Sequence, residues 1–230
     1  MNSTFLAGVT YSLGSAGETA YGVLATAEIH GLDQQGCTGM LDALRLAHEL
    51  LAVEPAWRTV LCVTVDRLPG DERSSGAAAC RVSATTAAFR VVATHQVAES
   101  ELDESVGLFF ALLPKLVREV LAKAAIGTDD IDWVVPQNTR SSAWTIVGKL
   151  LGIPMDRLWQ STFGELGHAV SADNIVNLSA LISSGALRAG QRVLLVMAGQ
   201  ATILEVTELL PVCAPAGACL SIGPDKCLIR

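Results

Sequence analysis

Hydrophobic and polar positions follow two different periods along this chain. Short β-branched or apolar runs, bounded by Gly, Pro or charged residues, predict buried strands over residues 5–11, 59–65, 77–84, 89–94, 132–135, 191–197 and 202–209. Apolar residues at helical spacing predict helices over 18–29, 39–53, 101–125, 141–151 and 173–183. Because strands and helices alternate, the pattern predicts an α/β fold.

The same order of elements occurs twice, although no exact repeat is present. The predicted helix 39–53 precedes the strand 59–65, and the helix 173–183 precedes the strand 191–197. This repeated helix–strand order suggests two related halves. From residue 210 the periodicity is lost and Pro, Gly and Cys dominate, so we expect an irregular tail over 210–230.

Composition excludes several classes of protein. Of 230 residues, 50% are hydrophobic, which is enough for a sizeable core. A net charge of −7 disfavours binding to nucleic acid or to anionic membrane surfaces, which require concentrated Lys and Arg. No apolar run approaches the ~18 residues of a membrane span. The first residues, 1–8, lack the pattern of a secretion signal, so we expect a cytoplasmic protein.

Metal and nucleotide motifs are missing from the sequence. None of the six cysteines forms a CxxC pair, and no HExxH, GxGxxG, GxxxxGK[ST] or GxSxG motif is present. We therefore expect no metal site and no permanently bound cofactor. In an intracellular chain the thiols would stay reduced.

Cys37 is the best candidate nucleophile. It lies directly before the predicted helix 39–53, where the helix dipole and unpaired N–H groups stabilise a thiolate. Its neighbours Gly36 and Gly39 permit a tight turn. The alternative is a structural cysteine, the role that we assign to Cys62 and Cys80 because they fall inside apolar strand patterns.

His168 and Asp173 form a second candidate constellation. His168 precedes the predicted helix 173–183, and Asp173 occupies its first turn. A carboxylate placed there could accept a hydrogen bond from the imidazole and fix its tautomer, as in a nucleophilic triad. Asp173 could equally be an ordinary helix-start residue.

Several segments together resemble the ketoacyl-ACP synthase III family. The runs 34–39 (QQGCTG) and 41–47 (LDALRLA) resemble its nucleophile turn and central helix. Further segments resemble later family motifs in the same order: 75–79 (SGAAA), 128–136 (TDDIDWVVP), 150–158 (LLGIPMDRL) and 184–195 (SGALRAGQRVLL). The resemblance is collinear over about residues 30–209.

The resemblance implies a thiolase-type layered αβαβα fold with two similar halves. We expect a first half over 1–98 that carries the nucleophile turn, a second half over 99–209, and the tail 210–230. In family members the cysteine lies much further from the N-terminus than position 37. The first half is therefore expected to be incomplete, lacking the segment between the opening strand and the nucleophile turn.

Two departures from the family pattern change the expected chemistry. Gln137 stands where the family has a histidine, and Arg140 stands where it has an asparagine. Gln cannot carry a proton at neutral pH, which disfavours decarboxylating condensation. Gly167-His168 with Asp173 instead resembles a divergent branch from secondary metabolism, in which a Cys-His-Asp set transfers acyl groups to hydroxyl or amine acceptors.

The resemblance thus implies an acyltransferase with Cys37 as nucleophile, His168 as base and Asp173 as its orienting partner. The acyl donor would be a phosphopantetheine thioester, as acyl-CoA or acyl carrier protein, and the chain would form a homo- or heterodimer. Candidate substrate-binding residues are Arg140, Asn138 and Gly199, the last in an altered oxyanion turn. One alternative is a non-catalytic subunit that completes a dimer with an active paralogue, and another is a thioester hydrolase.

Overall fold

A computed structural model of the chain describes most of the sequence. The described residues are 5–13, 31–32, 36–66, 76–85, 87–97, 106–162, 164, 167–208, 220–221 and 227–228. The predicted helix over 18–29 lies outside these residues, as do most of the tail 210–230 and the start of the predicted helix 101–125.

The central feature is a mixed sheet of seven strands in the order β2-β3-β1-β4-β7-β6-β5. Its strands are β1 (Phe5–Leu13), β2 (Thr59–Asp66), β3 (Gly76–Ser83), β4 (Phe89–Gln96), β5 (Trp133–Pro136), β6 (Arg192–Met197) and β7 (Gln200–Val206). Strands β5 and β6 run parallel, and the other paired strands run antiparallel. A short ladder between β1 and β4 joins the β2-β3-β1 part to the β4-β7-β6-β5 part.

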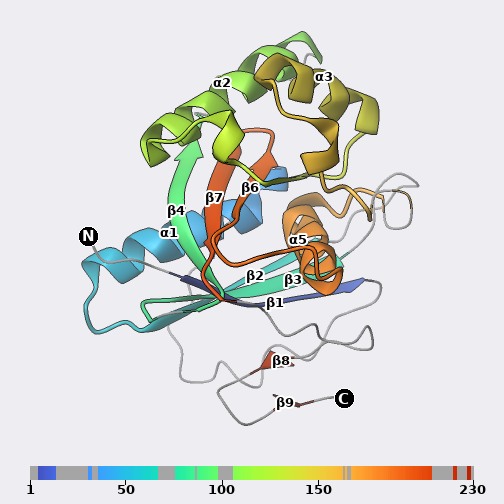
Figure 1. Cartoon of the computed structure of the whole chain (residues 1–230). Helices are drawn as coiled ribbons and strands as arrows, with labels where there is room; N and C mark the ends of the chain where they lie inside the picture. Colours follow the sequence, from blue (N-terminus) through green and yellow to red (C-terminus); the bar gives the residue numbers. More distant parts are fainter. Residues whose placement is uncertain are drawn as a thin grey trace.

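Helices form layers on both sides of the β4-β7-β6-β5 part (Figure 1). Helices α1 (Gly39–Val53) and α5 (Asp173–Ser183) pack between this part and the β2-β3-β1 part. Helices α2 (Val106–Ala124) and α3 (Ser141–Leu151) cover its opposite face. The described residues thus supply four successive layers of the predicted αβαβα arrangement.

Strand β6 shows how the two cores are divided. Val193, Leu195 and Met197 belong to the core around α1 and α5, whereas Leu194 and Val196 belong to the core around α2 and α3. This alternation follows from the two-residue period of a strand that is buried on both faces. The uninterrupted apolar run predicted such a strand.

Most predicted elements are confirmed. Helices α1, α3 and α5 have the predicted bounds, and Gly152 ends α3 in the left-handed region with φ of 70°. Strand β7 begins at Gln200, earlier than the predicted residue 202. Gly199, with φ of 101°, makes a tight turn that lets Gln200 pair with Met197.

The division into halves at residue 98 stays a prediction. Strand β4, from the first predicted half, pairs with β7 from the second between Phe89–Val206 and Gln96–Gln200. Within the tail, β8 (Leu220–Ser221) pairs with β9 (Cys227–Leu228). The helices among the described residues are all too short or too polar to cross a bilayer.

Helix α5 is buried between the two parts of the sheet, so a substitution in it tests the layered arrangement. Leu178 is fully buried between the two parts of the sheet, whereas Leu150 on α3 is 49% exposed. We expect Leu178→Ala to lower the free energy of unfolding by about 2–5 kcal/mol, because it removes core contacts and leaves a cavity. Chemical denaturation would measure this. Leu150→Ala is the matched control and should change stability by less than about 1 kcal/mol; equal losses would contradict the layering.

Candidate active site

Cys37 lies in a one-turn 3₁₀ helix, η2 (Gly36–Thr38), that leads directly into α1. Gly36 has φ of 52°, a left-handed conformation that a side chain would disfavour. The thiol is free and partly exposed, and it packs against the core around α1 and α5. The sequence therefore located the cysteine correctly at the start of a helix.

His168 approaches Cys37 from the other half of the chain. Its Nε2 lies 3.3 Å from the Cys37 Sγ, although 131 positions separate the two residues. His168 belongs to the turn 167–172, in which Gly167 and Val170 have φ of 64° and 51°. A positive φ is uncommon for a β-branched residue such as Val170, so this turn must be held by its surroundings.

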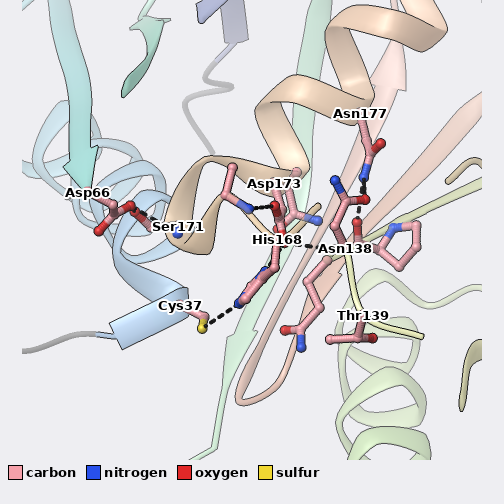
Figure 2. A network of polar contacts seen from close by, with 12 residues as sticks. Cys37, Asp66, Asn138, Thr139, His168, Ser171, Asp173 and Asn177 are labelled. Atoms are coloured by element: carbon pink, nitrogen blue, oxygen red, sulfur yellow. Dashed lines mark hydrogen bonds and ion pairs between the residues drawn. The ribbon is translucent and has the colours of Figure 1, made fainter. Parts of the chain in front are cut away.

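Asp173 binds the nitrogen of His168 that faces away from Cys37 (Figure 2). It is fully buried at the first position of α5, and its Oδ2 accepts a hydrogen bond from the His168 Nδ1. The backbone N–H of Ala169 donates to its Oδ1, and the backbone N–H of Asn138 donates to its Oδ2, both at 2.6 Å. Three donors and the helix N-terminus together satisfy a buried, ionised carboxylate.

The site raises the pKa of His168. Burial alone lowers the pKa of this imidazole, but the hydrogen bonds to Asp173 and Cys37 and their negative charges outweigh it and raise the pKa to about 10. A pKa in this range favours the imidazolium form at neutral pH, in which both nitrogens carry protons and the Nε2 faces the sulfur. A cation beside a cysteine stabilises the thiolate, which is the reactive form.

A buried amide network supports the Asn138 end of the site. The Asn138 Nδ2 donates to the Thr162 Oγ1 at 3.1 Å, and Thr162 donates to the Asn177 Oδ1 at 2.5 Å. The Asn177 Nδ2 donates to the Asn138 Oδ1 at 2.8 Å, so the three side chains form a closed ring of hydrogen bonds, and it also donates to the Pro136 carbonyl at 3.0 Å. Asn138, a predicted substrate-binding residue, thus uses its side chain within the protein and presents its backbone N–H to Asp173.

Gln137 is also part of the supporting structure. Its Oε1 accepts a hydrogen bond from the Ala198 N–H at 2.9 Å, which ties the end of β5 to the β6–β7 turn. Its carbonyl accepts from the Trp144 Nε1 at 3.1 Å. The predicted substrate-binding residue Gly199 is buried in that same turn, and its carbonyl accepts from the Val97 N–H at 2.9 Å.

Arg140, the remaining predicted substrate-binding residue, is exposed at the start of α3. The loop that leads to it rises from buried Gln137 and Asn138 through half-buried Thr139. This short segment therefore connects the centre of the site to the protein surface.

Sequence reasoning missed two polar residues beside the site. Gln200 is fully buried, and its Nε2 donates to the Leu41 carbonyl in α1 at 2.8 Å. Asp66, at the end of β2, accepts hydrogen bonds from Ser171 in the histidine-bearing turn. The available signals were a glutamine shortly before the predicted strand 202–209 and a carboxylate directly after the predicted strand 59–65, but neither signal indicates the hydrogen-bond partner.

Other kinds of site find no support in the part of the chain that the structure describes. No group of three or more His, Cys, Asp or Glu side chains there could hold a metal ion.

A cavity of about 10 Å³, lined among others by Val117, Trp144 and Met155, lies in the α2–α3 core. It is on the opposite side of the sheet from Cys37 and has room for about one water molecule.

Part of the chain is similar in sequence to known proteins. Residues 121–204 match the family model of the C-terminal part of 3-oxoacyl-[acyl-carrier-protein] synthase III. This segment contains His168 and Asp173, whereas Cys37 lies before it. The β-ketoacyl-[acyl-carrier-protein] synthase III of Synechocystis is 32% identical over 85 residues, which cover 37% of this chain and 26% of that protein.

Solved structures agree at the level of the fold. The acyltransferase ChlB3 has a TM-score of 0.65 at 24% identity, over 75% of this chain and 66% of that one. The 3-oxoacyl-[acyl-carrier-protein] synthase III of Aquifex aeolicus has a TM-score of 0.64 at 19% identity, over 74% and 65%. The predicted fold class is confirmed, because the described part of the chain has the layered α/β fold of these solved structures. The chain spans less than two thirds of the length of these relatives.

The Cys37–His168 contact predicts a reactive thiol. Replacing His168 by Gln removes the cation beside the sulfur, so we expect alkylation of Cys37 by iodoacetamide at pH 6.5 to slow by about ten-fold or more. Peptide mass spectrometry would follow the labelling of each cysteine. The matched control is His95→Gln, because His95 pairs with Glu119 between β4 and α2, away from the site. Equal rates in wild type and His168→Gln would show that the contact does not activate the thiol.

Proposed function

We propose that this protein is an acyltransferase that carries its acyl group on Cys37. The observation that supports the proposal is the chain of contacts from the Cys37 sulfur through His168 to buried Asp173. It supplies a nucleophile, a proton carrier and an orienting carboxylate, the three roles that nucleophilic acyl transfer needs.

In the first half-reaction the Cys37 thiolate would attack the carbonyl carbon of an acyl thioester. A new C–S bond forms, and the bond to the donor sulfur breaks. The departing thiolate takes the proton from the His168 Nε2, leaving an acyl-enzyme and a neutral imidazole. Backbone N–H groups at the start of α1 and at Gly199 are candidate donors for the developing oxyanion.

In the second half-reaction neutral His168 would act as a base. It takes the proton of a hydroxyl or amine acceptor, whose oxygen or nitrogen attacks the acyl carbon. The C–S bond to Cys37 breaks, and the thiolate and the protonated His168 are restored. Loss of the thiolate charge on acylation lowers the proton affinity of His168, so the same residue can serve both steps.

Gln137 argues against carbon–carbon bond formation by decarboxylation. Its amide cannot carry a proton, and its Oε1 is bound to the Ala198 N–H. An acyl transfer to oxygen or nitrogen needs only the Cys37, His168 and Asp173 set. This is why we place the protein with acyl transfer in a specialised pathway and not with fatty-acid condensation.

The proposed donor is a phosphopantetheine thioester, on CoA or on an acyl carrier protein, and we expect the protein to act as a homo- or heterodimer. Arg140 would contact the donor's phosphate, because it lies exposed at the outer end of the loop that begins at buried Gln137. Gly199 would contribute through its backbone N–H, and Asn138 would contribute indirectly, because its backbone N–H binds Asp173. No permanently bound cofactor is needed for this chemistry.

The second candidate is a non-catalytic partner of an active paralogue. The buried, structurally committed Gln137 in place of a titratable residue favours it. The two proposals differ in whether the thiol is ever acylated.

Intact-mass measurement with acyl-CoA donors of short and medium chain length distinguishes them. We expect a stable adduct of one acyl group, absent in Cys37→Ala and retained in Cys62→Ala, whose cysteine is buried in β2. Addition of hydroxyl or amine acceptors should then discharge the adduct, and Asp173→Asn should slow that discharge by about 10²-fold or more because the imidazole loses its orienting partner.

Absence of a Cys37-dependent adduct with every donor would reject the acyltransferase in favour of the partner subunit. Steady CoA release without any acceptor would instead indicate a thioester hydrolase.

A further inference from the structure

A second carboxylate, that of Asp66, forms hydrogen bonds with the turn that carries His168. It ends strand β2, and its Oδ2 accepts hydrogen bonds from both the backbone N–H, at 3.1 Å, and the hydroxyl of Ser171, 105 positions away. Thr64 on the same strand also contacts the Ser171 hydroxyl and lies 3.5 Å from Asp66. Figure 2 shows Asp66 and Ser171 on the far side of the turn from Asp173.

The segment that Asp66 binds is a single 3₁₀ turn with a strained backbone. Ser171 belongs to the 3₁₀ helix η6 (Val170–Ala172), which packs against β2 and against the Cys37 turn η2. Val170, directly before Ser171, has φ of 51°. A β-branched residue keeps this conformation only where its neighbours are fixed on both sides.

The carboxylates of Asp173 and Asp66 bind the turn before and after Val170, respectively. Asp173 binds the His168 ring and the Ala169 N–H, so it sets the first part of the turn. Asp66 binds both donors of Ser171, which is 1% exposed, so it sets the second part. Because β2 follows α1 in the chain, the contact also ties the histidine-bearing turn to the segment that carries Cys37.

We propose that Asp66 is a positioning residue which, through Ser171, holds the strained turn so that His168 stays in contact with Cys37. The role rests on the proposed function, in which that contact activates the thiol. Without Asp66 the Ser171 N–H loses its acceptor and the Ser171 hydroxyl keeps only its contact with Thr64. Val170 can then relax, and the His168 ring moves away from the sulfur.

Alkylation of Cys37 tests the positioning role independently of any acyl transfer. We expect Asp66→Ala to slow iodoacetamide labelling of Cys37 at pH 6.5 by about five-fold or more, because less of the thiol is held as thiolate. Asp66→Asn, which keeps one acceptor oxygen, and Ser171→Ala, which keeps the backbone donor, should give smaller losses. The matched control is Asp156→Ala, whose exposed carboxylate lies in η5 (Met155–Arg157), which borders the α2–α3 core and not the core that contains Cys37.

The sign of the effect separates positioning from direct electrostatics. If the Asp66 charge acted directly on the sulfur, its removal would favour the thiolate and speed labelling. A positioning role also predicts that Asp66→Ala has no further effect in a His168→Gln background. Buried Cys62 and Cys80 serve as internal reporters, since they stay unlabelled while the protein is folded.

An unchanged or faster rate in folded Asp66→Ala, or an undiminished loss in the His168→Gln background, would overturn the proposal. If Asp66→Ala exposes Cys62 and Cys80, the comparison passes to Asp66→Asn and Ser171→Ala. Wild-type rates in both of these would overturn it as well. Failure of acyl transfer with normal labelling effects would instead count against the proposed function alone.

Discussion

The buried carboxylate of Asp173 is the constraint on which the rest of the site depends. An ionised group without solvent contact is tolerated only where donors surround it, and Asp173 receives them from His168, Ala169 and Asn138. Each donor belongs to a segment that could otherwise move. Satisfying one charge therefore fixes the imidazole, the turn after it and the end of β5 at the same time.

The same charge gives the site its chemistry. In the proposed acyl transfer, His168, whose pKa is raised to about 10, would supply the proton that the departing thiolate needs. Gln137, at a position where the family resemblance would place a histidine, connects the end of β5 to the β6–β7 turn by accepting a hydrogen bond from the Ala198 N–H.

Sequence periodicity predicted the α/β fold and the bounds of α1, α3 and α5, since these helices alternate apolar and polar faces and end at clear signals such as Gly152. It also nominated Cys37, His168 and Asp173, which the structure brings together. It could not predict contacts that depend on how distant segments meet. The Asp66–Ser171 pair, the Gln200–Leu41 bond and the closed ring of Asn138, Thr162 and Asn177 are of this kind. The start of β7 was missed because Gly199 makes a tighter turn than its sequence context suggests.

The protonation state of His168, followed by NMR of its ¹⁵N-labelled imidazole across pH, tests the central claim most directly. We expect the ring to stay cationic through neutral pH and to titrate with a pKa of about 10, well above the usual 6.5. By linkage, the stability that the pair contributes is then present below about pH 6.5 and is lost as the pH rises through about 10. In Cys37→Ala the pKa of His168 should fall, since the thiolate no longer supports the cation. A ring that is already neutral at pH 8 in the wild-type protein would contradict the account.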